Sequence, residues 1–277
     1  MQHLIIPSSP SLAITVAGQG PLVILVHGLG GDRSTWPEQL SALQHNFTAV
    51  SVDLRGYGDS ADPPGPIDFK RDFCADLVAV MDYFQVPRAH LVGLSMGGRV
   101  CRSTALQVAD RVASLTLANT SPGFDHLNQA QLDAFVEARS GVIKDGQLPP
   151  NFGHQQAVAM MAPGAPERAI QTMANAVDRL RVANYLNTLQ SSTWQDRGDP
   201  LEDLACPVLL ITSELDTVYP PAVTESMLAR IPNATLTRIK GAGHISNLEQ
   251  PDAFNKALIH FLEALPREAN ARRAATA

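Results

Sequence analysis

The feature that most constrains this chain is a run of apolar residues that leads directly into a Gly-x-Ser-x-Gly motif. Residues 91–98 read Leu-Val-Gly-Leu-Ser-Met-Gly-Gly, and a helical pattern follows them. Such a sequence is typical of a sharp strand-to-helix turn that carries a serine at its tip. Gly93 and Gly97 would let neighbouring backbone pass close to a strained Ser95 without a Cβ clash. The motif alone also arises by chance in glycine-rich chains, so the interpretation depends on its context.

Apolar segments on both sides of this turn alternate between strand and helix patterns. The strand candidates are short runs rich in branched apolar residues, which are typical of strands covered on both faces. Helical apolar spacing lies between them, most clearly from Phe69 to Phe84. Because parallel strands need crossover connections, this order predicts an α/β fold with a mostly parallel, doubly wound sheet. The strands expected in this part cover residues 12–16, 22–26, 47–52, 89–94 and 112–118.

The pattern changes after residue 121. The next segment contains helical stretches and no convincing buried strand, and strand patterns resume at 208–212 and 234–239. A last helix is expected from 251 to 265. The sequence therefore predicts a helical cap inserted between two strands of one core sheet. The predicted parts are a core of residues 1–121 and 201–266, a cap of residues 122–200, and a frayed tail of residues 267–277.

Charge and cysteine content argue against several functions. The formal net charge is −6 and there is no long basic run, which disfavours nucleic acid as the main partner. Cys74, Cys101 and Cys206 lack metal-ligand spacing, so we expect free thiols, no metal and no other cofactor. The N-terminus does not resemble a signal peptide, and no apolar run approaches the roughly twenty residues of a membrane span. A cytoplasmic protein without a membrane partner is expected.

A serine hydroxyl is a weak nucleophile, so Ser95 would need a base and a group that orients the base. His244 is the best candidate for the base, because it lies in the loop directly after the last predicted strand. Such loops meet at the carboxyl edge of a parallel sheet, where ligands bind. The acid should follow the strand at 208–212, where Asp216 and Glu214 compete. We favour Asp216, because the loop must travel outward before a side chain can turn toward His244.

Hydrolysis of a carbonyl compound also needs donors for the negative charge that develops on the substrate oxygen. The backbone N–H of Met96 would open the helix after Ser95 and is well aimed for this purpose. A second N–H is expected from the loop after the strand at 22–26, which reads His-Gly-Leu-Gly-Gly from His27. We assign this second donor to Leu29.

Several linked motifs, in this order, resemble those of the α/β-hydrolase superfamily over residues 10–265. The resemblance is greatest to the 3-oxoadipate enol-lactonases and related small esterases. It implies an α/β-hydrolase fold with a cap, and a cofactor-free hydrolase of carboxylic esters or lactones that forms an acyl-enzyme through Ser95, Asp216 and His244. It also implies that the turn at 53–60 is structural. The motifs are His-Gly-Leu-Gly-Gly at 27–31, Asp-Leu-Arg-Gly-Tyr-Gly-Asp-Ser at 53–60, Gly-Leu-Ser-Met-Gly-Gly at 93–98, Asp216 before a proline pair, and Gly243-His244 before Glu249-Gln250-Pro251.

An enol-lactone substrate of this kind carries a free carboxylate, so its pocket should supply a cation, best an arginine. Arg139, on the first expected cap helix, roughly matches the arginine that the lactonases place there. Arg168, Arg179 and Arg181 are further candidates in the same segment, and each of the four could instead lie on a solvated helix face.

Two other functions remain open at this point, and the oligomeric state is open as well. A C–C bond hydrolase of aromatic ring-cleavage products would use the same three residues. In that group, the strand-to-helix turn usually carries a polar residue before the serine and an aromatic residue after it, unlike Leu94 and Met96 here. A ligand receptor with slow turnover on the same fold is the second alternative. Perhydrolase side activity is compatible with any acyl-enzyme, because hydrogen peroxide can replace water.

Overall fold

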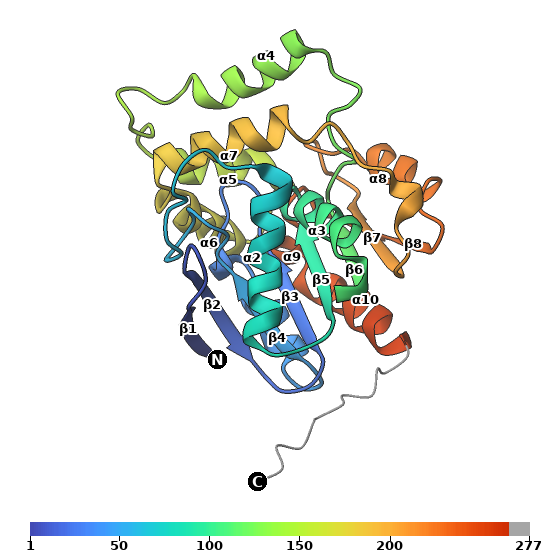
Figure 1. The fold of residues 1–277 in the computed structure, drawn as a ribbon. Coiled ribbons are helices and arrows are strands. Elements are labelled where there is room, and N and C mark those ends of the chain that lie inside the picture. Colours follow the sequence, from blue (N-terminus) through green and yellow to red (C-terminus); the bar gives the residue numbers. More distant parts are fainter. Residues whose placement is uncertain (266–277) are drawn as a thin grey trace.

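The computed structural model describes residues 1–265, and the predicted tail at 267–277 lies outside them (Figure 1). Among these residues, eight strands form one sheet in the order β1-β2-β4-β3-β5-β6-β7-β8. The pairs that involve β1 and β2 are antiparallel and all others are parallel, so the predicted mostly parallel α/β sheet is confirmed. The strands are β1 (Gln2–Ile6), β2 (Leu12–Ala17), β3 (Leu22–Val26), β4 (Thr48–Val52), β5 (Ala89–Leu94), β6 (Val112–Ala118), β7 (Val208–Ser213) and β8 (Ala234–Ile239).

The strand pattern did not predict β1. This strand pairs antiparallel with β2, for example Gln2 opposite Val16, and it forms one edge of the sheet. Most of its side chains are exposed, and Ile5 is 58% exposed. An edge strand with little burial has no regular alternation of apolar and polar residues, so its sequence gives only a weak signal.

Helices cover both faces of the sheet, which confirms the doubly wound arrangement (Figure 1). Alternate residues of β3 enter two different cores: Ile24 packs in one, while Val23 and Leu25 pack in the other. This is why the strand reads as a continuous apolar run, since neither of its faces meets water. The helices on the first face are α2 (Phe69–Tyr83), α3 (Met96–Gln107) and α8 (Pro221–Leu228), and those on the second are α1 (Pro37–Leu43), α9 (Ser246–Glu249) and α10 (Pro251–Ala264).

Helices α4 to α7 follow β6 and precede β7, and we refer to them as the inserted helices. They lie above the sheet in Figure 1, and α4 is the outermost of them. Within the insertion, α5 packs against α6 and α4 packs against α7. The boundaries that the sequence suggests for a cap domain, 122 and 200, stay a prediction. The inserted helices are α4 (Gln129–Ser140), α5 (Phe152–Met160), α6 (Glu167–Asp178) and α7 (Val182–Trp194).

Within residues 1–265, no helix combines the length and the apolar character needed to cross a bilayer. The three cysteines are all buried and unpaired. Burial raises the pKa of the Cys206 thiol to about 11, and it raises the pKa of Cys101 as well. These thiols therefore stay protonated at neutral pH and act as small packing residues.

Candidate active site

Ser95 occupies the turn between β5 and α3 in a strained backbone conformation. Its φ is 55° and its ψ is −120°, a region that residues with a side chain rarely adopt. The close backbone passage expected from the two motif glycines is present. A Cβ on Gly93 would lie 2.2 Å from the carbonyl oxygen of Gly97, and a Cβ on Gly97 would lie 2.2 Å from that of Val26. Any larger residue at these positions would force the turn apart.

The structure brings His244 and Asp216 together. His244 Nδ1 lies 3.0 Å from Asp216 Oδ2 and 3.1 Å from Oδ1, and both residues are buried. Because a carboxylate only accepts hydrogen bonds, Nδ1 carries the proton and donates it toward Asp216. Glu214, the competing acid, is exposed and accepts a hydrogen bond from the N–H of Gly241 at 3.1 Å instead.

Asp216 is held in its ionised form. Burial by itself would raise the pKa of this carboxyl group, but hydrogen bonds from His244, Asn119 and the N–H of Tyr219 outweigh it, and the pKa is lowered. The N–H groups of Val218 and Tyr219 donate to Oδ1 at 2.8 and 2.9 Å. The carboxylate is therefore a fixed negative charge behind the His244 ring at neutral pH.

Ser95 and His244 line the same small cavity. Its volume is about 20 Å³, measured as the space open to the centre of a water molecule, which is room for about one water. Within residues 1–265, His244 Nε2 has no hydrogen-bond partner, and no bond joins it to the Ser95 hydroxyl. Such contacts are often long in an empty site and shorten when substrate binds. Met160 of α5 and Met173 of α6 close the cavity from the side of the inserted helices.

The loop after β3 passes directly over Ser95. A Cβ on Gly28 would lie 3.1 Å from Ser95 Cβ and 3.6 Å from Ser95 Oγ, and Leu29 lines the shared cavity. His27 fixes this loop from below: its Nδ1 donates to the carbonyl of Gly28 at 2.9 Å, and its Nε2 accepts from the N–H of Leu54 at 3.2 Å. Burial is the main cause of the lowered pKa of His27, so its ring stays neutral and keeps this tautomer.

The N–H of Met96 begins α3 beside Ser95. The first N–H groups of a helix have no partner within the helix, and the helix dipole makes this end favourable for negative charge. Met96 directly follows Ser95 in the chain, and Leu29 lines the cavity that Ser95 lines. Their role in binding a substrate oxygen remains a prediction.

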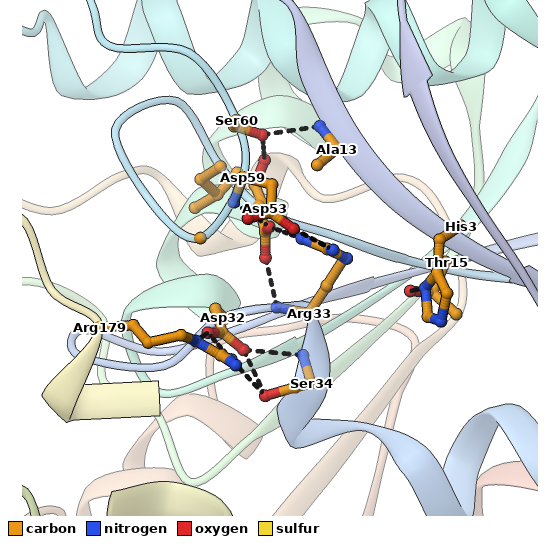
Figure 2. Close-up of polar contacts among 12 residues, drawn as sticks. His3, Ala13, Thr15, Asp32, Arg33, Ser34, Asp53, Asp59, Ser60 and Arg179 are labelled. Atoms are coloured by element: carbon orange, nitrogen blue, oxygen red, sulfur yellow. Dashed lines mark hydrogen bonds and ion pairs between the residues drawn. The ribbon is translucent and has the colours of Figure 1, made fainter. Parts of the chain in front are cut away.

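Three of the four candidate arginines are paired with groups on the core. Figure 2 shows Arg179 reaching Asp32 and Ser34, which follow the loop that covers Ser95. Arg181 donates to the carbonyl oxygens of Gly58 and Ser60, both at 2.7 Å, and pairs with Asp62. Arg168 is paired with Glu38 of α1. These three side chains attach the inserted helices to the core, and their guanidinium groups are paired within the protein.

Arg139 differs from the other three. Its guanidinium stacks 3.5 Å from the centre of the Phe135 ring and donates to the Phe135 carbonyl at 3.2 Å. No carboxylate within residues 1–265 pairs with it. Burial lowers its pKa most, and the nearby Arg99 lowers it further, whereas Tyr219 and Tyr185 act in the opposite direction. The centre of the Tyr219 ring in turn lies 5.6 Å from the centre of the His244 ring.

The turn at 53–60 contributes no group to the cavity. Asp53 accepts from the N–H of Arg33 at 2.6 Å and from that of Asp59 at 2.8 Å. The Arg33 side chain bridges both carboxylates, as Figure 2 shows. Arg55 is paired with buried Asp76 at 2.7 Å. These contacts fix the turn against the loop after β3, which is a structural role.

Sequence reasoning missed two buried residues beside the candidate site and left Glu249 without a role. Asn119, directly after β6, donates to Asp216, and Ser246 donates to Asn119. Glu249 accepts from the N–H groups of Gly243, Ile245 and Ala162 at 2.7 to 2.9 Å, so it supports the His244 loop on both sides. A polar residue at the end of a buried strand was the only signal for Asn119, and it does not reveal a partner.

Comparison with known proteins assigns the family. Residues 21–251 match the family model described as alpha/beta hydrolase fold. The 3-oxoadipate enol-lactonase 2 of Acinetobacter baylyi is 28% identical over 253 residues, which cover 90% of both chains. A putative carbamate hydrolase, RutD, of Caulobacter segnis is 31% identical over 262 residues, covering 90% of this chain and 93% of the relative.

Solved structures agree with this assignment. A malate-bound thermophilic esterase from Thermogutta terrifontis superposes with a TM-score of 0.84 at 26% identity, covering 95% of this chain and 98% of the esterase. An enol-lactonase from Burkholderia xenovorans gives a TM-score of 0.78 at 25% identity and covers 95% and 100% of the two chains. The chain therefore belongs to the α/β-hydrolase family and is a hydrolase.

Proposed function

We propose that this protein hydrolyses a carboxylic ester or lactone through an acyl-enzyme on Ser95. The observation that carries the proposal is that His244 pairs through Nδ1 with buried Asp216 at 3.0 Å, while the same imidazole lines the cavity that contains Ser95. A base with an orienting acid on one side and a strained serine on the other is the arrangement that nucleophilic acyl transfer needs.

In the proposed reaction, Ser95 Oγ attacks the substrate carbonyl carbon while His244 Nε2 takes the hydroxyl proton. Asp216 stabilises the imidazolium that forms. The N–H groups of Leu29 and Met96 donate to the oxyanion of the tetrahedral intermediate. The intermediate collapses when the imidazolium gives its proton to the leaving alkoxide. His244 then deprotonates a water molecule, which attacks the acyl carbon. The second tetrahedral intermediate breaks its bond to Ser95 Oγ, which takes the proton from the His244 imidazolium, and the carboxylic acid is released.

We assign to Arg139 the recognition of a carboxylate on the substrate, as in an enol-lactone. The support is the contrast among the four arginines, since Arg139 has no carboxylate partner among the described residues while the other three are paired. Burying a guanidinium without a counter-ion costs free energy, and an anionic ligand that pairs with it offsets this cost. An enol-lactonase and a malate-bound esterase among the relatives agree with this substrate class.

A substrate panel tests the proposal. It should contain p-nitrophenyl acetate, an enol-lactone with a free carboxylate, the methyl ester of that lactone, an N-alkyl carbamate and a diketone cleaved at a C–C bond. We expect the carboxylate-bearing lactone to give the highest kcat/KM. Ser95→Ala should lower kcat on every ester by about 10⁴-fold or more. Full turnover by this variant would disprove the mechanism, and preference for the diketone would favour the C–C hydrolase.

A further inference from the structure

Asn119 occupies an unusual position beside the proposed site. It follows β6 directly, its side chain is buried, and its φ is 45°. Asparagine tolerates this left-handed region better than most residues with a side chain. Its backbone N–H donates to the carbonyl of Ile211 on β7 at 2.8 Å. The backbone is therefore held so that the side chain projects among the loops that follow β7 and β8.

The Asn119 amide connects these loops. Nδ2 donates to Asp216 Oδ2 and to Ser213 Oγ, both at 2.9 Å, and Oδ1 accepts from Ser246 Oγ at 2.6 Å. The carbonyl of Gly243 lies 3.5 Å from Nδ2, at the limit of a hydrogen bond. The carboxylate of Asp216 fixes the orientation of the amide, because an ionised carboxylate accepts only, and a reversed amide would set two acceptors against each other.

The two oxygens of Asp216 are supported differently. Oδ1 accepts from the backbone N–H groups of Val218 and Tyr219, which any residue at these positions would provide. Oδ2 accepts from Asn119 and from His244. Without the Asn119 amide, Oδ2 would keep only the His244 contact, and the carboxylate could pivot about Oδ1, which the two N–H groups hold. A turned carboxylate would carry the imidazole away from Ser95.

We infer that Asn119 is a positioning residue that fixes the carboxylate plane of Asp216, and through it the His244 ring. This inference rests on the proposed function, because it gives Asp216 and His244 their part in the reaction. Ser246 supports the arrangement from behind by holding Oδ1 of the same amide. The role differs from general packing because it acts through one carboxylate oxygen.

Asn119→Gly tests the inference, because glycine accepts the positive φ while the amide is removed. We expect kcat on p-nitrophenyl acetate to fall by about 10- to 100-fold, a fraction of the roughly 10⁴-fold effect of impairing the acid itself. KM should change less than about twofold, since no substrate contact is lost. Ser246→Ala, which leaves the Asn119–Asp216 bond in place, is the matched control and should have a smaller effect on kcat.

A double-mutant cycle separates positioning from a structural role. In an Asp216→Ala background there is no carboxylate to orient, so Asn119→Gly should lower kcat no further. An undiminished additional loss in that background would overturn the inference. So would an unchanged kcat in the single Asn119→Gly variant.

A charge-changing variant gives an independent readout, also if the glycine variant fails to fold. Asn119→Asp has the same shape but places a second carboxylate against Asp216, and such a pair holds a proton to higher pH. Its acidic limb of kcat/KM should move to higher pH and its activity should recover as the pH rises. A pH profile identical to that of the wild type would contradict the inference. Ser95→Ala tests the mechanism separately. If Ser95→Ala loses activity while the Asn119 variants keep the activity of the wild type, only the positioning role is rejected.

Discussion

Helix α4 and the pair α6–α7 belong to the same insertion, but they are held to the rest of the molecule in different ways. The α6–α7 region is attached to core groups by Arg168, Arg179 and Arg181. Helix α4 buries Leu132 and Val136, and its small apolar cluster is shared with α7 rather than with the sheet. Figure 1 shows it as the outermost helix.

Helix α5 is attached still more closely, at the proposed site itself. The carbonyl of Met160 accepts from the backbone N–H of His244 at 2.8 Å. Glu249 binds the N–H of Ala162 and that of Gly243 through the same oxygen. A Cβ on Gly243 would lie 2.5 Å from the backbone nitrogen of Ala162, so glycine is needed for this approach. Movement of α5 would therefore disturb the His244 loop.

This difference separates two roles of arginines in the insertion: attachment to the core and, for Arg139, availability to a ligand. Arg168 of α6, and Arg179 and Arg181 between α6 and α7, are paired with groups of the core. The charge of Arg139 on α4 is unpaired among the described residues and is available to a ligand. The cavity at Ser95 has room for about one water, and α4 contributes no residue to its lining, so a substrate has to displace side chains such as Met160 of α5 and Met173 of α6.

Among the arginines of the insertion, the largest effect is expected for Arg139. Arg139→Met should lower kcat/KM on the carboxylate-bearing lactone by about 100-fold, or roughly 2.7 kcal/mol, because a charge-assisted contact is lost. Its kcat/KM on p-nitrophenyl acetate should stay within about threefold of the wild type. Steady-state kinetics on both substrates measure the difference. An equal loss on both would show that Arg139 supports α4 rather than the substrate.

A smaller effect, on stability instead of specificity, is expected for Arg179. Arg179→Met removes the partner of Asp32, which is 2% exposed. Because the Arg179 side chain itself is 53% exposed, solvent screens the pair, and we expect a loss of about 1 kcal/mol in the free energy of unfolding. Urea denaturation at pH 7 measures it. A variant as stable as the wild type would remove the distinction between α4 and α6–α7.

This deficit should depend on pH in a defined direction. Burial would raise the pKa of Asp32, but hydrogen bonds from Ser34 and Arg179 outweigh it and lower the pKa below its usual value. A lowered pKa contributes stability above the unfolded value of about 3.9, and the contribution is lost as the pH falls through the folded value. The stabilities of wild type and Arg179→Met should therefore begin to converge as the pH falls below about 4. Denaturation curves at pH 7 and pH 3 give the comparison.

The smallest effect is expected for Arg168, which makes it the matched control for Arg139. Its side chain is 75% exposed, although it pairs with Glu38. Arg168→Met should cost less than about 0.5 kcal/mol, as for other exposed ion pairs. Its kcat/KM on the carboxylate-bearing lactone should equal that of the wild type. A loss of specificity here would mean that the positive charge of the insertion acts as a whole.

Sequence patterns predicted the core of the fold because the burial of each strand or helix sets the spacing of its apolar residues. The buried run of β3 and the turn at Ser95 were both found in this way, since continuous apolar residues and small residues at a strained turn leave a local trace. The edge strand β1 was missed because its side chains are mostly exposed. The helices of the insertion were expected, but the ion pairs that attach them to the core were not. The sequence around an arginine does not show whether a carboxylate faces it in the fold.

The sequence by itself determined the order of the core strands from β2 onward and of the helices between them, the turn at Ser95, and the candidates for base and acid. Only the tertiary structure decided that Asp216 rather than Glu214 faces His244, that Asn119 holds that carboxylate, and that one arginine of four is left unpaired among the described residues. The physical reason is range. Backbone preferences and burial periods act over a few neighbouring residues, whereas these hydrogen bonds and ion pairs join side chains that lie far apart in the chain and meet only when the loops at one sheet edge are assembled.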